Sequence, residues 1–215
     1  MQRLHPWERT WRSGFWKEGP PPSPAVAKFT TLLKKSKAVR VLDLGSGPGR
    51  HTVFLAEIGF QVTALDVSET ALRILDRHVR KNGFSNVTIV KHDLQKLPFL
   101  DEYFDAIVST DVIHHGLGSE IKVALGEIRR VLRKKGYCIL IVLSDKDLRL
   151  GSGRQLEPGT WRFTQGEEKG ITHHFFREEE LRSYLKDFEI KSLKEDLFAV
   201  EKGYRAHFQA VLRKP

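Results

Sequence analysis

Residues 39–68 read VRVLDLGSGPGRHTVFLAEIGFQVTALDVS, and this stretch decides the fold. An apolar run ends at Leu44, and three glycines then occupy alternate positions, Gly45, Gly47 and Gly49. An amphipathic segment and a second apolar run follow, which is the order strand, tight turn, helix, strand. Such turns bind a dinucleotide, a nucleotide phosphate or a ligand without phosphate, and the residues around the glycines must distinguish these three cases.

The alternation of strand and helix continues along the chain. Further strands, short runs rich in Val and Ile, are predicted at residues 87–93, 104–110 and 137–144. Helices are predicted at residues 50–59, 68–83 and 119–136. The last two begin at the N-cap candidates Ser68 and Ser119 and end at Gly83 and Gly136. Steady alternation predicts an α/β fold, with a parallel sheet that carries helices on both faces.

The rest of the chain divides into an N-terminal arm and a C-terminal extension. Residues 1–24 form a basic, aromatic arm that ends in the stiff sequence GPPPSP, and residues 25–215 form the sheet domain. Residues 145–174 are rich in Gly, Pro and charge without sustained periodicity, which predicts a long substrate-side loop that covers an acceptor pocket. A helix is then predicted at residues 177–188, and strands are predicted at 189–197 and 205–214.

Composition bounds the class of protein. Hydrophobic residues make up 40% of the 215 residues, no apolar run is long enough to span a membrane, and the charged N-terminus has no signal-peptide core. The single cysteine, Cys138, excludes an internal disulfide, and its apolar surroundings predict a buried bystander. We therefore expect a soluble, cytoplasmic protein. Scarce Asn beside abundant Lys, Arg and Glu favours a heat-adapted source.

The residues around the glycine turn argue against a phosphate ligand. A dinucleotide turn requires G-x-G-x-x-G, but the third glycine here comes one place early and Arg50 follows it. Asp43, two places before the first glycine, would repel a pyrophosphate and attract a cationic amino group. S-adenosylmethionine carries such a group and no phosphate. Asp66, at the end of the next strand, is placed to accept its ribose hydroxyls, and Asp93 and Leu94 are placed to bind its adenine.

Four motifs within residues 39–144 resemble one protein family. In order they are VLDLGSGPGRH, ALDVS, KHDLQKLPFLDEYFDAIVSTDVIHH and EIRRVLRKKGYCILIV, and they are similar to the motifs of class I S-adenosylmethionine-dependent methyltransferases. The resemblance implies a Rossmann-like, seven-stranded, mostly parallel sheet whose last strand is antiparallel. It also implies the cofactor S-adenosyl-L-methionine. The candidate cofactor-binding residues are Asp43, Gly45, Ser46, Gly47, Arg50, His51, Asp66, Val67, Asp93, Leu94 and Thr110.

Methyl transfer is an in-line displacement for which the enzyme mainly supplies alignment, an effect worth about 7–11 kcal/mol. In the family that the motifs resemble, the acceptor meets the methyl group beside the turn after the fourth strand, here STDVIHHGLG. The candidate catalytic residues are Asp111, His114 and His115 in this turn, and His173 and His174 near the end of the long loop. Either histidine pair is placed to act as a general base; packing under the cofactor or anchoring the loop is the alternative role.

The four histidines also raise the question of a metal ion. Adjacent histidines on an extended strand point to opposite faces of a sheet, so the two members of a pair do not converge on one ion. Neither a second cysteine nor a clear carboxylate partner accompanies them in the sequence. No metal site is therefore predicted.

Two sets of features give opposite indications of the acceptor. The turn VIHH and the basic arm resemble methyltransferases that complete wobble-uridine modification in tRNA, whereas GITHHFFREEEL and the terminal strands resemble small-molecule enzymes of the tellurite- and thiopurine-methyltransferase type. The net charge of +9 is concentrated in residues 1–40, so the remaining chain lacks the broad basic face of a tRNA binder. We expect a small or medium-sized acceptor; tRNA is the alternative, and a non-catalytic cofactor-binding partner subunit is a third hypothesis.

The arm interleaves basic and aromatic residues, namely Arg3, Arg9, Arg12 and Lys17 with Trp7, Trp11, Phe15 and Trp16. Trp7, Trp11 and Phe15 recur every four residues, which predicts one apolar face of a helix. Such a face must dock on a surface, and the rim of the cofactor cleft, at the carboxyl ends of the strands, is the predicted one. There the arm would act as a lid. A helix that only caps the sheet is the alternative.

Overall fold

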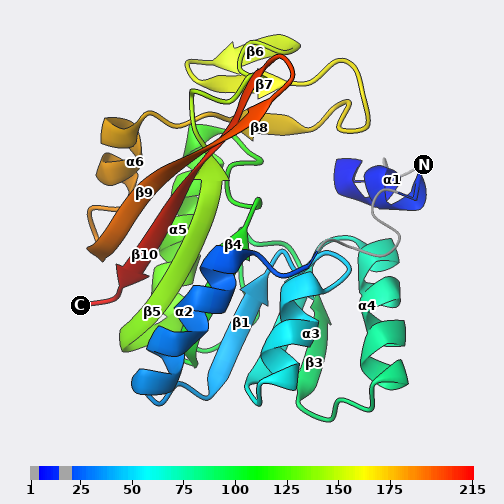
Figure 1. The fold of residues 1–215 in the computed structure, drawn as a ribbon, viewed down its shortest axis with the longest axis vertical. Helices are drawn as coiled ribbons and strands as arrows, with labels where there is room; N and C mark the ends of the chain where they lie inside the picture. The colour runs from blue at the N-terminus through cyan, green and yellow to red at the C-terminus, as the bar shows by residue number, and fades with distance from the viewer. Residues whose placement is uncertain (1–4, 15–20) are drawn as a thin grey trace.

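The computed structural model describes residues 5–14 and 21–215. The helices are α1 (Pro6–Arg12), α2 (Pro24–Lys35), α3 (Arg50–Glu57), α4 (Glu69–Lys81), α5 (Gly118–Val131) and α6 (Glu178–Tyr184). The strands are β1 (Arg40–Leu44), β2 (Gln61–Asp66), β3 (Val87–Lys91), β4 (Phe104–Thr110), β5 (Leu132–Leu143), β6 (Arg154–Glu157), β7 (Thr160–Arg162), β8 (Thr172–His174), β9 (Glu189–Val200) and β10 (Gly203–Arg213). Figure 1 shows a large sheet, with α1 and the small sheet β6–β8 toward one end of it.

The large sheet has seven strands in the order β3-β2-β1-β4-β5-β10-β9. The first five strands of the chain are parallel, since β1 pairs in parallel with β2 and β4, β2 with β3, and β4 with β5. β10 runs antiparallel to both of its neighbours, β5 and β9. The predicted seven-stranded, mostly parallel sheet with an antiparallel last strand is confirmed.

Two apolar layers cover the two faces of this sheet, because its strands are hydrophobic on both sides. On one face, α2 and α3 pack on Val41 and Val62, and α4 packs on Ala64. On the other face, α5 and α6 pack on a layer that contains Leu42. Neighbouring residues of β1 therefore point to opposite faces, as the period of two requires. Cys138 is buried in the second layer, as predicted.

The predicted C-terminal end of the third helix is wrong. α5 ends at Val131 and β5 begins at Leu132, so Gly136 lies within a strand instead of closing a helix. A side chain at Gly136 would lie 2.9 Å from the carbonyl oxygens of both Arg133 and Asp105. This close approach of the backbone explains why position 136 is a glycine. The sequence pattern alone fits a helix end equally well.

Of the other predicted helix caps, those of α4 are confirmed and the N-cap of α5 is wrong. Ser68 is the N-cap of α4, and Gly83 follows the helix with a φ of 67°, both as predicted. Ser119 is not the N-cap of α5, because that helix begins one residue earlier, after Leu117. The Leu117 amide donates to the Glu120 carboxylate at 2.7 Å. A glutamate in the first turn therefore caps the helix N-terminus, the role that Ser119 was expected to have.

The predicted loop at residues 145–174 contains a second sheet. Strands β6, β7 and β8 are antiparallel and only three or four residues long, which is too short for a periodic signal in the sequence. The segment leaves and rejoins the large sheet at one point, where the Asp145 amide donates to the Phe176 carbonyl at 2.9 Å. Within residues 5–14 and 21–215, no helix is both long and apolar enough to cross a bilayer.

Candidate active site

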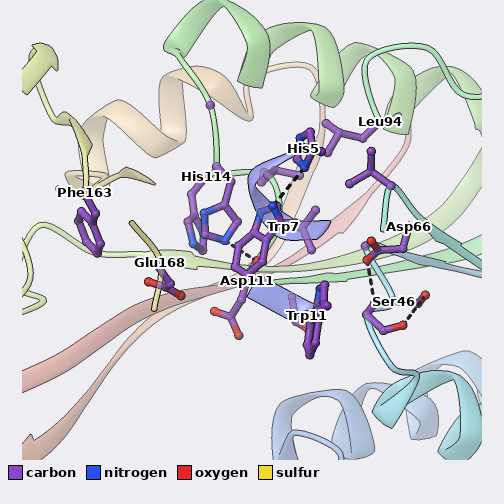
Figure 2. A pocket seen from close by; sticks show the side chains of 18 of the residues that line it. His5, Trp7, Trp11, Ser46, Asp66, Leu94, Asp111, His114, Phe163 and Glu168 are labelled. Atoms are coloured by element: carbon purple, nitrogen blue, oxygen red, sulfur yellow. Dashed lines mark hydrogen bonds between the residues drawn. The ribbon is translucent and has the colours of Figure 1, made fainter. Parts of the chain in front are cut away.

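A cavity of about 1130 Å³ opens at the carboxyl ends of β1, β2 and β4, where open α/β sheets bind their ligands. One wall, here called the glycine side, consists of lining residues between Gly45 and Thr110. The opposite wall, here called the histidine side, consists of lining residues between Asp111 and His207. Figure 2 shows Ser46, Asp66 and Leu94 on one side of the view, Phe163 and Glu168 on the other, and tryptophans of α1 between them.

The glycine turn lets the backbone form the wall of the cleft. Gly45, Gly47 and Gly49 have φ values of 71°, 54° and 94°, a left-handed region in which glycine has no steric penalty. A Cβ on Gly45 would lie 2.3 Å from Val112, and a Cβ on Gly47 would lie 3.2 Å from the ring of Trp11. A side chain at Gly45 would therefore overlap Val112, and one at Gly47 would press against Trp11.

Asp66 ends β2, and it lines the glycine side of the cleft (Figure 2). Its two oxygens accept hydrogen bonds from the amides of Gly47 at 2.9 Å and Ser68 at 2.8 Å. Burial raises the pKa of this carboxyl, and the two amide bonds oppose the shift. Each oxygen retains a second lone pair that can accept a ligand hydroxyl. The same wall includes the predicted residues Ser46, Arg50, Val67, Asp93, Leu94 and Thr110.

His51 also lines the glycine side, and both of its ring nitrogens have partners. The Ser23 amide donates to Nε2 at 3.2 Å, so Nδ1 carries the proton and donates to the Thr110 hydroxyl at 3.3 Å. Burial, together with the charge of Arg50, lowers the pKa of His51 to about 3. The ring is therefore neutral at pH 7 and serves to position Thr110.

Asp43 was expected to face the ligand, but it is not among the residues that line the cavity, so its part in cofactor binding stays a prediction. It is buried and accepts a hydrogen bond from the Thr52 hydroxyl at 2.6 Å. Burial raises the pKa of this carboxyl from 3.8 to about 6, although the Thr52 bond and the charge of Arg50 oppose the shift. Asp43 can therefore act on a ligand in the cleft only through its field.

The raised pKa of Asp43 predicts a pH-dependent effect of Asp43→Asn. A carboxyl whose pKa is about 6 when folded, against 3.8, stabilises the fold below pH 3.8, and this contribution is lost as the pH rises through 6. When the pH rises from 4 to 8, the unfolding free energy of the wild type should therefore fall by up to about 3 kcal/mol relative to that of the variant. Urea unfolding at both pH values measures this fall, and an equal difference at the two would contradict the prediction.

Three of the four predicted histidines come together on the histidine side. The ring centroids of His114 and His115 lie 4.2 Å apart, and those of His115 and His173 lie 4.7 Å apart. Phe163 stacks on His173 with a centroid distance of 3.9 Å. One ring nitrogen of each of the three histidines lies within 4.8 Å of the other two. The expectation that the histidines do not converge is therefore wrong for this trio.

His173 and His174 point to opposite faces of β8, as predicted for neighbours on a strand. His174 Nδ1 lies 2.7 Å from the Thr160 hydroxyl, and its Nε2 lies 3.3 Å from the Glu180 carboxylate. Both histidines are buried, and neither lines the cavity. A general base must lie within hydrogen-bond reach of the acceptor, so the role of this pair as a base stays a prediction that the geometry does not support.

Asp111, His114 and His115 do line the cleft. Burial raises the pKa of Asp111, but the hydrogen bond and charge of His207 and the charge of Arg50 outweigh burial and leave that pKa below its ordinary value. Burial lowers the pKa of His115 to about 4, so its ring is neutral at pH 7. His207, which was not predicted, reaches the site from β10. Nothing in the sequence distinguishes it from the other residues of that strand.

Helix α1 crosses the cleft and is bonded on both sides. On the glycine side, the Glu8 carboxylate accepts hydrogen bonds from the Ser68 hydroxyl at 2.7 Å, the Thr70 hydroxyl at 2.6 Å and the Thr70 amide at 3.2 Å. On the other side, the Thr10 hydroxyl donates to the Glu167 carbonyl at 3.2 Å. Helix α1 thus lies over the carboxyl ends of the strands, and the action of the arm as a lid stays a prediction.

The two tryptophans of α1 line the cavity (Figure 2). Trp7 meets the His115 ring edge-on, with centroids 4.7 Å apart, while Trp11 is buried beside the glycine turn. Arg12 forms an ion pair with Glu8 at 2.9 Å on the same helix. The other arm residues named above, which are Arg3, Phe15, Trp16 and Lys17, lie outside the described residues.

Glu8→Ala is expected to release α1 from the cleft at pH 7. Burial raises the pKa of Glu8, but hydrogen bonds from Thr70 and Ser68 outweigh it and leave the pKa at about 2. Since 4.5 is the ordinary value, the carboxylate stabilises docking above pH 4.5, and this effect is lost as the pH falls through 2. Losing charged hydrogen bonds costs about 1.5–3 kcal/mol, so trypsin should cleave after Arg9 and Arg12 roughly 10- to 150-fold faster. The same rate in Glu8→Ala as in the exposed control Glu57→Ala would contradict this.

Solved structures of other proteins share this fold. The 1,6-didemethyltoxoflavin-N1-methyltransferase of Burkholderia thailandensis, solved with 1,6-didemethyltoxoflavin and S-adenosylhomocysteine, matches with a TM-score of 0.71 and 22% identity, over 100% of this chain and 92% of that chain. TehB of Haemophilus influenzae matches with a TM-score of 0.68 and 19% identity, over 97% of this chain and 67% of that chain. The fold is that of the class I methyltransferases.

Sequence comparison identifies the domain itself. Residues 42–140 match the family model of the methyltransferase domain. A probable S-adenosyl-L-methionine-dependent methyltransferase, TehB of Haemophilus influenzae, is 26% identical over 164 residues, which are 76% of this chain and 50% of that protein. An uncharacterized methyltransferase of Anoxybacillus flavithermus is 35% identical over 111 residues, 52% of this chain and 50% of that protein. The chain spans about half or less of the curated relatives it matches. The chain thus contains a methyltransferase domain, and its relatives confirm the predicted resemblance to S-adenosylmethionine-dependent methyltransferases and the predicted cofactor.

Proposed function

We propose that this protein transfers the methyl group of S-adenosylmethionine to a small-molecule acceptor. The observation that carries the proposal is one continuous cavity of about 1130 Å³ with two unlike walls. Pockets for a single small ligand measure about 300–1,000 Å³, so this volume accommodates a cofactor together with a small acceptor. The glycine side offers a carboxylate and bare backbone, and the histidine side offers aromatic rings.

The residues of the glycine side fit the cofactor. The Asp66 carboxylate has free lone pairs for two ribose hydroxyls, and Leu94 offers an apolar surface to adenine. Gly45 and Gly47 line the cleft, so backbone without a side chain faces the methionine portion. When bound, S-adenosylmethionine supplies an electrophilic methyl group on its sulfonium.

The histidine side holds the acceptor in this proposal. Alignment of the acceptor with the methyl group is the main contribution of the chain, and the tryptophans of α1 exclude water from the cleft. Asp111, His114 and His115 are the proposed catalytic residues. Since the pKa of His115 is about 4, this histidine is a weak base, which suits an acceptor whose proton is acidic or already lost.

The comparisons support a small acceptor over tRNA. The structural neighbour from Burkholderia thailandensis was solved with 1,6-didemethyltoxoflavin bound, and none of the three relatives named above is described as a tRNA enzyme. The chain from residue 41 onward carries nearly balanced charge, which disfavours a nucleic-acid surface. A cytoplasmic location, and closure of residues 145–174 over the acceptor, stay predictions.

Two measurements test the proposed function. Calorimetry with S-adenosylhomocysteine and with NAD should give binding heat for the first only. Transfer from labelled S-adenosylmethionine into an ultrafiltered small-molecule extract and into total tRNA should then label the small-molecule fraction, with or without ribonuclease. Label confined to a ribonuclease-sensitive fraction would favour tRNA. Cofactor binding with no label in any fraction would favour the non-catalytic subunit.

A further inference from the structure

We propose that His114, His115 and His173 bind a divalent transition-metal ion of the zinc type at the histidine side of the cleft. One ring nitrogen of each lies within 4.8 Å of the other two. An ion at the centre of these three nitrogens would lie no farther than about 2.8 Å from each of them. A zinc–imidazole bond measures about 2.0–2.1 Å. Ring shifts of less than about 1 Å therefore bring the three nitrogens to bonding distance.

The hydrogen bonds of these rings leave ligand atoms free. His115 Nε2 lies 2.8 Å from the Asp111 carbonyl, which can only accept, so Nε2 carries the proton and Nδ1 holds a lone pair. That Nδ1 is buried and lies near the Thr172 backbone, but it makes no hydrogen bond of normal geometry. Neither ring nitrogen of His173 makes one, although Nε2 lies 3.5 Å from the Glu168 carboxylate. His114 Nδ1 receives only a long bond, 3.4 Å, from the Leu143 amide. Buried nitrogens without partners are rare in native proteins, and a bound ion is one explanation for them.

The surroundings also suit a metal ligand set. A carbonyl that accepts from the second ring nitrogen, as the Asp111 carbonyl does for His115, is the usual support of a metal-binding histidine. Glu168 lies with one carboxylate oxygen 3.5 Å from His173 Nε2 and lines the cleft, so it is a candidate fourth ligand. The positive charge of Arg149 is offset by its ion pairs with Asp147 at 2.9 Å and Glu168 at 3.3 Å.

The ligand type determines the class of ion. Imidazole nitrogens suit zinc and the neighbouring divalent transition metals, whereas magnesium and calcium prefer oxygen. Burial keeps all three histidines neutral, the protonation state that binds metal. Since His114 and His115 line the cleft, a coordination position that Glu168 does not fill would face the acceptor and ease loss of its proton. This last consequence rests on the proposed function; metal binding itself does not.

The test measures metal binding alone, without cofactor or acceptor. Chelator-treated full-length protein is titrated with Co²⁺, whose visible absorption reports nitrogen coordination, and with Zn²⁺ by calorimetry. His173→Phe keeps the ring that stacks on Phe163 and removes the ligand nitrogens. His174→Phe is the matched control, because His174 is equally buried on the opposite face of β8. His115→Asn is a second variant at a less buried position, and thermal melting establishes that each variant folds.

The wild type should bind one ion per chain, with melting temperature raised by Zn²⁺. His173→Phe and His115→Asn should each weaken binding by at least about 10- to 100-fold, since even loss of a second-shell partner has that effect. His174→Phe should bind as the wild type does. Absence of stoichiometric binding by the wild type, or binding unchanged in folded His115→Asn, would overturn the proposal. An equal loss in His174→Phe would also overturn it. None of these outcomes depends on methyl transfer, so they are independent of the proposed function.

Discussion

Gly45→Ala is expected to destabilise the fold by about 2–5 kcal/mol and to abolish cofactor binding. The left-handed φ of 71° costs a residue with a Cβ about 1–2 kcal/mol. The new Cβ would also lie 2.3 and 2.6 Å from the two γ carbons of Val112, an overlap that costs about 1–3 kcal/mol. Urea unfolding measures the stability, and calorimetry with S-adenosylhomocysteine measures the affinity.

Two further variants separate the backbone penalty from the overlap. Gly59 has a φ of 93° and nothing within 4 Å of a Cβ, so Gly59→Ala should cost only the backbone penalty of about 1–2 kcal/mol and leave cofactor binding intact. The double variant Gly45→Ala/Val112→Ala removes the overlapping methyl groups and should recover part of the stability. Equal losses in Gly45→Ala and Gly59→Ala would show that contact with Val112 is unimportant.

Asp66→Ala is expected to weaken cofactor binding by about 1.5–3 kcal/mol, or roughly 10- to 150-fold in dissociation constant. The carboxylate lines the cleft, and it already holds the Gly47 and Ser68 amides in place. Its loss would remove the predicted acceptor of the ribose hydroxyls and leave the two amides without a partner. Calorimetry with S-adenosylhomocysteine gives the affinity directly.

The controls for Asp66→Ala address charge and folding. Asp76 forms an exposed ion pair with Arg80 on α4, so Asp76→Ala removes one negative charge outside the cleft and should leave affinity unchanged. Asp66→Asn keeps the shape and one acceptor oxygen and should have an intermediate effect. A wild-type affinity in folded Asp66→Ala would exclude this carboxylate from the cofactor site.

The sheet is predictable because its signals are local. Residues 61–66 and 104–110 are predicted as strands and are strands over those same ranges, since their apolar runs end at clear turn residues. The position of Asp66 follows directly, because the carboxyl end of a parallel strand faces the ligand crevice. Helix α2 escaped prediction although Ser23 and Pro24 form an N-terminal signal, the serine before the first helical residue and the proline at it.

The site beyond the strand ends depends on tertiary structure. Asp43 is two residues before Gly45, but its place within β1 turns its side chain toward Thr52 instead of the cleft. His173 comes from β8, far along the chain from His115, and only the path of residues 145–176 brings the two rings together. Sequence spacing carries no information on such a meeting, so the histidine cluster had to be seen in three dimensions.

The closed path of residues 145–176 makes this part of the chain a self-contained cassette. The cassette leaves and rejoins the large sheet at one point, where the Asp145 amide donates to the Phe176 carbonyl. Its length can therefore change with little entropic cost. The lining residues of the glycine side all precede residue 111, outside the cassette. Exchanging the cassette between related proteins would therefore change Phe163 and Glu168 in the cavity wall and leave the glycine side unaltered, a simple route to engineered chimaeras.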